Sequence, residues 1–229
     1  KPWIENYSRQ VIKDLAISSS GNSAVSAAKI CGELGIKLHA FVSPRIDTGK
    51  VGRIREYTSV VLHTTKTPNR DVFQFCKARE IPNLRASRDD AALEGYKEIA
   101  YELRKQLPNA DNIFIPTSSG ATLEGMYLGF MNSNANSLTH PPSPLSYPKR
   151  GGEHEDAPTK SPALFAIQTT KVHPIAEYFD KDFTAEKASR ATAIVDRVAH
   201  RRDRVIEIIK TTGGGGFVIS NMELEGISH

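Results

Sequence analysis

The amino-acid sequence predicts an α/β fold in which helices cover parallel sheets. From residue 14 onward, short β-branched segments alternate with longer segments of helical periodicity, as expected where crossover helices connect parallel strands. The chain has 229 residues, 39% of them hydrophobic, which is enough for one large or two small domains. Two turns rich in serine and glycine each lie between a strand and a helix, a position where α/β proteins often bind ligands.

The predicted elements follow one another in a regular order. Strands are expected at residues 15–18, 37–42, 60–63, 112–116, 163–168 and 217–220. Helices are expected at residues 24–34, 70–79, 90–107, 185–195 and 196–210, with others beginning near Thr122 and Asn221. Residues 133–162 are rich in Asn, Ser, Pro and Gly and contain few large apolar side chains, so they are predicted to form a flexible insertion.

Composition excludes several classes of protein. No apolar segment approaches the roughly 20 residues that span a bilayer, and the first residues do not resemble a signal peptide. The net charge of +4 is small, and most basic residues alternate with acidic ones. We therefore expect a cytoplasmic protein that binds neither membranes nor nucleic acids.

One basic cluster interrupts this pattern. It consists of Arg197, His200, Arg201, Arg202 and Arg204, in a segment whose apolar residues have helical spacing. A nucleic-acid patch is one interpretation, but no motif of a nucleic-acid-binding module accompanies it. A solvated helix face is the interpretation that the spacing favours.

Cysteine and histidine spacing gives no sign of a metal site. Cys31 and Cys76 are far apart, without a CxxC or Cys/His pattern, so buried reduced thiols are expected rather than a disulfide framework. His63, His140, His154, His173 and His200 lack the mutual spacing of metal ligands and are assigned structural roles.

The first serine-rich turn spans residues 18–23, with the sequence Ser-Ser-Ser-Gly-Asn-Ser. It follows a predicted buried strand and precedes a helix rich in alanine. Free N–H groups and the helix dipole favour a carboxylate or phosphate at such a position. The alternative is a simple helix N-cap, for which serine and asparagine are preferred in any case.

The second turn spans residues 116–125, with the sequence Pro-Thr-Ser-Ser-Gly-Ala-Thr-Leu-Glu-Gly. Successive N–H groups in such a turn can hold a phosphate without a lysine. The turn lacks the GK[ST] of a P-loop, so nucleoside triphosphates are disfavoured. An ordinary capped helix is again the alternative. If both turns lie at the carboxyl ends of parallel strands, one can hold a phosphate and the other a carboxylate.

The two motifs together resemble those of the fold type II pyridoxal-phosphate enzymes, the family of threonine synthase, cysteine synthase and the tryptophan synthase β subunit. Residues 19–23 are similar to its [ST]-S-G-N-[ST] asparagine loop, and residues 118–125 to its G-[TS]-G-G-T-L-x-G phosphate loop about a hundred residues downstream. Ser118 and Ala121 stand where that pattern has glycine. Residues 94–103 are similar to the helix that precedes the phosphate loop in threonine synthases, and residues 167–170 to the strand that follows it.

The resemblance implies a role for each loop. Pyridoxal phosphate would be the cofactor, and Asn22 would hydrogen-bond its ring hydroxyl. Ser19, Ser20, Gly21 and Ser23 would bind the α-carboxylate of a small amino-acid substrate. The cofactor phosphate would be bound by Ser118, Ser119, Gly120, Ala121 and Thr122. Ser228 is a candidate for the residue that meets the pyridine nitrogen, although a surface serine is the simpler interpretation.

The catalytic lysine is the part of the resemblance that the sequence leaves open. In the family it lies in a segment like S-x-K-D-R before the asparagine loop, and no such segment occurs in these 229 residues. Lys1 is the nearest candidate, and the alternatives are a lysine upstream of it or a solvated terminal lysine. The chain is accordingly expected to be truncated at both ends.

The resemblance also implies an architecture and an activity. It implies a two-domain, three-layer sandwich with parallel sheets: a small mobile domain at residues 1–80 with the asparagine loop, and a large domain at residues 81–229 with the phosphate loop. The expected protein is a homodimeric lyase that catalyses β-elimination or β/γ-replacement on an amino acid, with O-phosphohomoserine to threonine favoured. The alternative is a catalytically silent relative that binds a phosphorylated ligand or a partner subunit.

Overall fold

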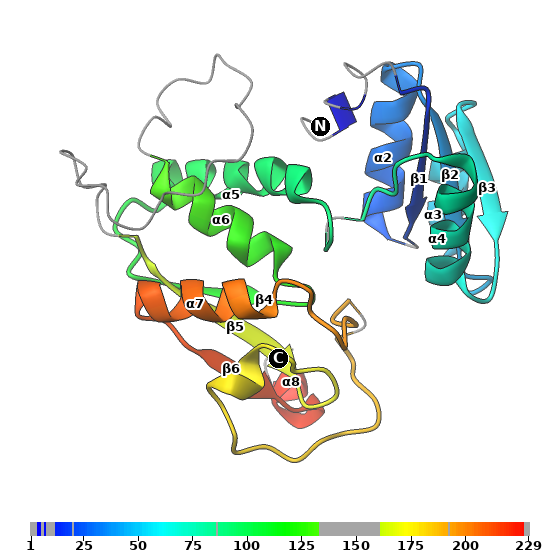
Figure 1. The fold of residues 1–229 in the computed structure, drawn as a ribbon. Helices are drawn as coiled ribbons and strands as arrows, with labels where there is room; N and C mark the ends of the chain where they lie inside the picture. The colour runs from blue at the N-terminus through cyan, green and yellow to red at the C-terminus, as the bar shows by residue number, and fades with distance from the viewer. Residues whose placement is uncertain are drawn as a thin grey trace. The chain divides into compact units, whose positions relative to one another are not determined.

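The computed structural model describes residues 4, 5, 7, 12–19, 21–85, 87–132, 161–191 and 193–226. The chain divides into two compact units, residues 1–85 and 86–229 (Figure 1). Lys1, Ser20 and Ser228 lie outside the described residues, as does the predicted insertion apart from Ser161 and Pro162. Each unit is built on its own three-stranded parallel sheet, which confirms the predicted α/β class.

The first unit has three layers. Its sheet has the order β1 (Asp14–Ser18), β2 (Lys37–Val42), β3 (Val60–Thr64). Leu15, Ile17 and Leu38 point to one face and share a core with α2 (Asn22–Glu33) and with Ile54 of α3 (Thr48–Arg55). On the other face, Ala16 and Phe41 pack with α4 (Pro68–Arg79). This alternation follows from the two-residue period of a strand.

Local sequence explains where these helices begin. Asp47 caps α3, with its Oδ1 accepting the N–H of Lys50 at 3.0 Å. Pro68 opens α4, where its missing N–H costs nothing. Sequence analysis missed α3 because the helix is short and contains two glycines, Gly49 and Gly52.

Both cysteines are buried free thiols, as expected. Burial raises the pKa of Cys31 to about 12 and that of Cys76 to about 11. Both side chains therefore remain protonated at neutral pH and act as small apolar groups.

A chain of polar contacts crosses the sheet of the first unit. His39 Nε2 lies 3.3 Å from Asp14 Oδ1, and His39 Nδ1 lies 3.2 Å from His63 Nε2. Burial lowers the pKa of both imidazoles, repulsion by Arg79 lowers both further, and Asp14 partly opposes the effect at His39. His63 also stacks on Phe41, with ring centroids 4.4 Å apart. The folded unit therefore favours neutral histidines here.

The second unit has the strand order β4 (Asn112–Pro116), β5 (Ala163–Thr169), β6 (Gly216–Ile219). Its core combines one face of this sheet with three helices, α5 (Leu93–Gln106), α6 (Ala121–Met131) and α7 (Arg202–Thr212). Two short 3-10 helices, η1 (Asp90–Ala92) and η2 (Ala176–Tyr178), and a final helix α8 (Asn221–Gly226) complete the described part.

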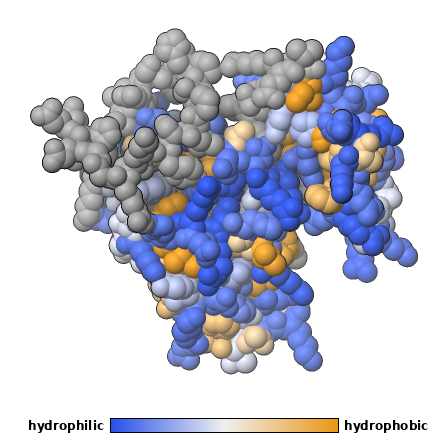
Figure 2. Space-filling model, in the orientation of Figure 1, coloured by the Kyte–Doolittle hydropathy of each residue, from blue (hydrophilic) through white to orange (hydrophobic). Residues whose placement is uncertain are grey.

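Three phenylalanines line up across the strands of the second unit on the face opposite this core. Phe114, Phe165 and Phe217 lie on β4, β5 and β6, with neighbouring ring centroids 4.7–6.0 Å apart. Phe114 and Phe217 are exposed. Elsewhere, hydrophilic side chains cover most of the visible faces of both units (Figure 2). None of the described helices is long and apolar enough to span a membrane.

The helix predicted at residues 185–195 is wrong. The described residues of that segment form no helix, and α7 begins at Arg202 rather than at residue 196. Tertiary contacts occupy the backbone groups of this segment: the N–H of Arg190 donates to the side chain of Asn221, whose amide donates to the carbonyl of Ala188. Because these groups bond to distant side chains, the helical spacing of the apolar residues is overridden.

Helices α5 and α6 approach each other closely through two glycines. A Cβ at Gly125 would lie 2.4 Å from Cβ of Tyr96, and one at Gly129 would lie 2.7 Å from both Cβ of Ala100 and the carbonyl of Lys97. Gly125 and Gly129 are one turn apart, so they form a smooth strip on one face of α6. Any larger residue there would push α5 away.

We predict that Gly129→Ala lowers the free energy of unfolding by about 1–3 kcal/mol, because the added methyl overpacks the helix contact. Gly95→Ala is the matched control, since Gly95 lies in α5 and a Cβ there meets nothing within 4 Å. That substitution should be neutral or stabilise by up to about 1 kcal/mol. Urea denaturation of both variants measures the difference, and equal stabilities would contradict the close packing.

We also predict that the histidine pair makes stability depend on pH between about 5 and 7. Because the folded pKa values lie below the ordinary value of 6.5, the pair's contribution is full above that pH and is lost as pH falls through the folded values. The melting temperature of His63→Gln should therefore fall less than that of the native chain between pH 7.5 and 5. His200→Gln, at an exposed position, serves as the control. Parallel pH profiles for His63→Gln and the native chain would rule out this role.

Candidate functional site

The turn before α6 begins at Thr117, whose N–H and hydroxyl both donate hydrogen bonds to neighbouring strands. Its N–H donates to the carbonyl of Ile167 at 2.8 Å, and its hydroxyl donates to the carbonyl of Ile115 at 2.7 Å. Both contacts belong to the strands β4 and β5. The chain therefore leaves the carboxyl end of β4 in a fixed direction.

The side chain of Gln168 also fixes this turn. Its side chain is fully buried, and its Nε2 donates to the carbonyls of Thr117 at 3.1 Å and Ser118 at 3.5 Å. Its Oε1 accepts the N–H groups of Ile175 and Ala176, each at 2.8 Å. A buried amide needs such partners, and here they connect β5, the turn and η2. Sequence analysis placed Gln168 only in a strand and missed this role.

Gly120 gives the turn its shape. It has φ of 91° and ψ of −6°, the left-handed region that glycine adopts readily, and it directly precedes α6. A Cβ at this position would lie 2.6 Å from Cγ2 of Val205, so neither the backbone conformation nor the available space suits another residue. From here on, the name phosphate loop is used for residues 118–122, the first part of the segment 118–125 that resembles the family's loop.

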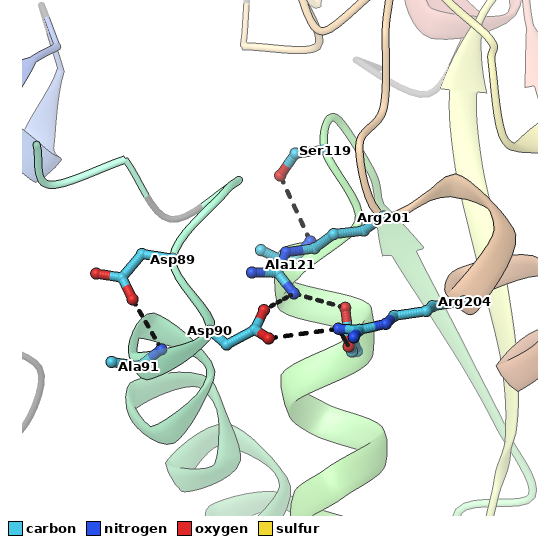
Figure 3. Close-up of polar contacts among 8 residues, drawn as sticks. Asp89, Asp90, Ala91, Ser119, Ala121, Arg201 and Arg204 are labelled. Carbon is cyan, nitrogen blue, oxygen red and sulfur yellow. Dashed lines mark hydrogen bonds and ion pairs between the residues drawn. The ribbon is translucent and has the colours of Figure 1, made fainter. Parts of the chain in front are cut away.

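Several N–H groups of the phosphate loop lack a backbone acceptor, which indicates an anion site. The N–H of Ala121 is 3.4 Å from Oγ of Ser119 (Figure 3). Those of Ser119, Gly120 and Thr122 have no protein acceptor among the described residues. Unbonded N–H groups at the start of a helix attract anions, and the helix dipole adds to the effect. The phosphate loop can therefore bind a phosphate through its backbone.

Ser118 does not offer its hydroxyl to a ligand. Its Oγ accepts the N–H groups of Val195 and Asp196, each at 3.1 Å, and lies 3.3 Å from Oδ2 of Asp196. The serine that replaces a glycine of the family pattern therefore anchors residues 195–196 to the loop. The phosphate-binding role predicted for Ser118 would therefore fall to its backbone rather than to its hydroxyl.

Glu124, in the first turn of α6, has a fully buried carboxylate. Its Oε2 accepts a bond from Arg201 Nη1 at 2.8 Å, and its Oε1 lies 3.3 Å from Arg204 Nη1. Arg201 is only 4% exposed and also lies 2.9 Å from Oδ1 of Asp90. Figure 3 shows Arg201 and Arg204 reaching Asp90 from the segment that starts α7.

The predicted solvated face at residues 197–204 is therefore wrong for Arg201. Arg197, His200 and Arg204 are exposed, as expected, but Arg201 is buried because two carboxylates compensate its charge. Val198, which the apolar spacing placed inside, is 71% exposed because α7 begins four residues later. The burial of Arg201 could not be predicted from the sequence, because its ion pairs join residues far apart in the chain and produce no local pattern.

The first serine-rich turn lies at the start of α2. Gly21 is the N-cap in an extended conformation, and its N–H donates to Oγ of Ser19 at 3.2 Å. Asn22 and Ser23 are exposed at the first positions of the helix. Among the described residues, no side chain of the N-cap residue bonds the first N–H groups of α2.

The described residues contain no cluster of three His, Cys, Asp or Glu side chains that could hold a metal ion. In each unit, a segment rich in serine and glycine lies between a strand of the parallel sheet and the N-terminus of a helix. These features define the class of α/β proteins that bind anionic groups at helix N-termini. Comparisons with known proteins then give the family.

The chain belongs to the pyridoxal-phosphate-dependent enzyme family, whose sequence profile matches residues 5–225. This confirms the resemblance found in the two loops, and pyridoxal phosphate is the cofactor of this family. A comparison with curated proteins gave no match.

Solved structures of several enzymes share the fold. The processed threonine deaminase isoform 2 of Solanum lycopersicum has a TM-score of 0.68 at 15% identity, over 96% of this chain and 56% of that one. The O-acetylserine-dependent cystathionine β-synthase of Helicobacter pylori has 0.67 at 12% identity, over 96% and 64%. Maize serine racemase has 0.65 at 15% identity, over 93% and 58%. The chain thus spans less than two thirds of the length of each.

The residues of the phosphate loop fit the cofactor's phosphate group. The left-handed Gly120 and the N–H groups without protein acceptors form a backbone cradle that needs no cationic side chain. Lys1, the candidate for the catalytic lysine, lies outside the described residues, as does Ser20 of the asparagine loop.

We predict that Gly120→Ala destabilises the protein more than Gly213→Ala does. Both glycines have positive φ, so both substitutions carry a backbone cost of about 1–2 kcal/mol. Only at Gly120 does the added methyl collide with Val205, while a Cβ at Gly213 meets nothing within 4 Å. Gly120→Ala should therefore lose about 1–3 kcal/mol more. Guanidinium denaturation compares the two, and equal losses would show that Val205 makes room.

Proposed function

We propose that this chain is part of a pyridoxal-phosphate-dependent lyase that acts on an amino acid by β-elimination or β/γ-replacement. One observation carries the proposal: a left-handed glycine and N–H groups without protein acceptors lie at the N-terminus of α6, in a chain of this family. The cofactor, when bound, withdraws electrons from the substrate Cα so that a proton can leave it. The chain's own residues bind and orient the reacting groups.

The phosphate loop would hold the cofactor by its phosphate. The N–H groups of Ser119, Gly120 and Thr122 would donate to phosphate oxygens, and the hydroxyl of Thr122 is a further donor on the first turn of α6. Gln168 and Thr117 keep these donors fixed, so little ordering is needed on binding.

The asparagine loop would serve the substrate and the cofactor ring. We propose that Asn22 hydrogen-bonds the ring hydroxyl and that Ser19, Ser20, Gly21 and Ser23 bind the substrate α-carboxylate. The exposed position of Asn22 and Ser23 at the start of α2 supports this, since the helix dipole favours a carboxylate there.

Within this class, we propose the conversion of O-phosphohomoserine to threonine. It is supported by the similarity of residues 94–103 to the corresponding helix of threonine synthases. The threonine deaminase, cystathionine β-synthase and serine racemase are all named for amino-acid chemistry, which supports an amino-acid substrate more broadly than any single reaction. A homodimer stays a prediction from the family resemblance, and a cytoplasmic location stays a prediction from the composition.

A second candidate function is binding without turnover. It is favoured by the backbone N–H groups of the phosphate loop, which could hold a phosphorylated ligand without any catalytic side chain. A protein of this kind would hold a phosphorylated ligand or a partner subunit through the same phosphate loop.

We predict that the chain binds pyridoxal phosphate and that Asn22→Ala weakens binding or shifts the absorbance of the bound cofactor. Ser26→Ala, at an exposed position of the same helix α2, should behave like the native chain. Absorbance titration gives the affinity, and borohydride reduction with mass mapping identifies any labelled lysine. Assay with O-phosphohomoserine, serine and threonine then tests the reaction.

Each result decides between the two functions. One labelled lysine and turnover of an amino acid would support the lyase. Cofactor binding without a labelled lysine would favour binding without turnover. An absorbance spectrum identical to that of the free cofactor would exclude the lyase and leave only the binding of another phosphorylated ligand or of a partner subunit.

A further inference from the structure

We propose that Arg201 is a positioning residue for the phosphate loop: it neutralises the buried carboxylate of Glu124 and so keeps the N-terminus of α6 able to bind a phosphate monoester. The inference rests on the proposed function of that loop. It assigns a role to a residue outside both of the loops that the family resemblance identified.

The position of Glu124 makes this role necessary. Glu124 is three residues after Ala121, so its carboxylate is attached within one helical turn of the N–H groups that would bind phosphate. It is fully buried, so water screens its charge poorly. A negative group in the first turn also interacts with the same helix dipole that attracts the ligand. Left alone, this carboxylate would compete with a phosphate.

Arg201 removes the competition in two ways. Its Nη1 binds Glu124 Oε2 at 2.8 Å, which directs the carboxylate toward the start of α7 and balances its charge. The same nitrogen lies 2.9 Å from Oδ1 of Asp90, and Arg204 Nη1 lies within 3.5 Å of both carboxylates. Two guanidiniums thus face two carboxylates, and Figure 3 shows Arg201 and Arg204 converging on Asp90.

Arg201 also lies against the loop itself. A Cβ at Gly120 would lie 3.6 Å from Cβ of Arg201, and the carbonyl of Arg201 accepts the N–H of Val205 at 2.9 Å. Val205 is the residue that packs most closely on Gly120. The start of α7 therefore packs against the left-handed turn at Gly120. The same packing holds the backbone of Arg201 in place beside the phosphate loop.

The electrostatic role makes a prediction that a purely structural role does not. Arg201→Gln removes the positive partner and leaves a buried negative charge near the loop, so phosphate affinity should fall by about tenfold or more. Glu124→Gln removes the negative charge instead, so affinity should stay equal or rise. The double variant should return close to the affinity of the native chain. A loss of affinity in Arg201→Gln without any loss in Glu124→Gln identifies charge as the cause.

The experiment is calorimetric titration of the full chain with inorganic phosphate and with pyridoxal phosphate. Arg202→Gln is the matched control: it removes one neighbouring positive charge, but Arg202 contacts the carbonyl of Pro174 and Asp203 rather than Glu124. That control should bind like the native chain. Arg201→Lys keeps the charge and should recover part of the affinity lost in Arg201→Gln.

Four results would overturn the inference. Equal weakening by Glu124→Gln and Arg201→Gln would show a structural role only, and unchanged binding by Arg201→Gln would show no role at all. If Arg201→Gln fails to fold, weaker phosphate binding by Glu124→Gln contradicts the charge argument by itself. If the native chain binds neither phosphate nor pyridoxal phosphate, the proposed function fails first, and the inference fails with it.

Discussion

The second unit depends on one buried ion pair, that between Glu124 and Arg201. It joins α6 to the start of α7, and through Asp90 it reaches η1 at the start of α5. Removing one member of such a pair typically costs about 3–5 kcal/mol, because the other charge is left buried without compensation. The N-termini of three helical segments are therefore held together by charges whose single removal lowers stability.

Besides the ion pair, several other contacts hold the phosphate loop in its conformation. Gln168 binds the carbonyls at the start of the loop, Ser118 accepts two N–H groups from residues 195–196, and Val205 packs on Gly120. All of these contacts leave the N–H groups of Ser119, Gly120 and Thr122 available. The surrounding side chains thus bond the carbonyl groups at the start of the loop and leave N–H groups that suit a phosphate.

Sequence alone predicted the elements whose pattern is local. All six strands of the described residues were predicted near their observed bounds, because short apolar runs between turn residues are a strong signal. The helix at residues 185–195 failed, since its backbone groups bond to Asn221. The two loops were recognised from their order and context, whereas the roles of Gln168 and Arg201 depend on partners 51 and 77 residues away. Such long-range pairing of polar groups has no periodicity to detect.

These separations bear on how the protein folds. The contacts that shape the phosphate loop join residues 50–80 positions apart, so they form only after a long stretch of chain has closed. Contacts of this kind slow folding, because the entropy of closure is lost before the contacts compensate it. The cost of closure grows only with the logarithm of length, by about 0.6 kcal/mol for each doubling. A change in the length of the sequence between α6 and β5 should therefore alter the entropy of closure only slightly. The contacts between the phosphate loop and α7 should keep most of their stability when that length changes.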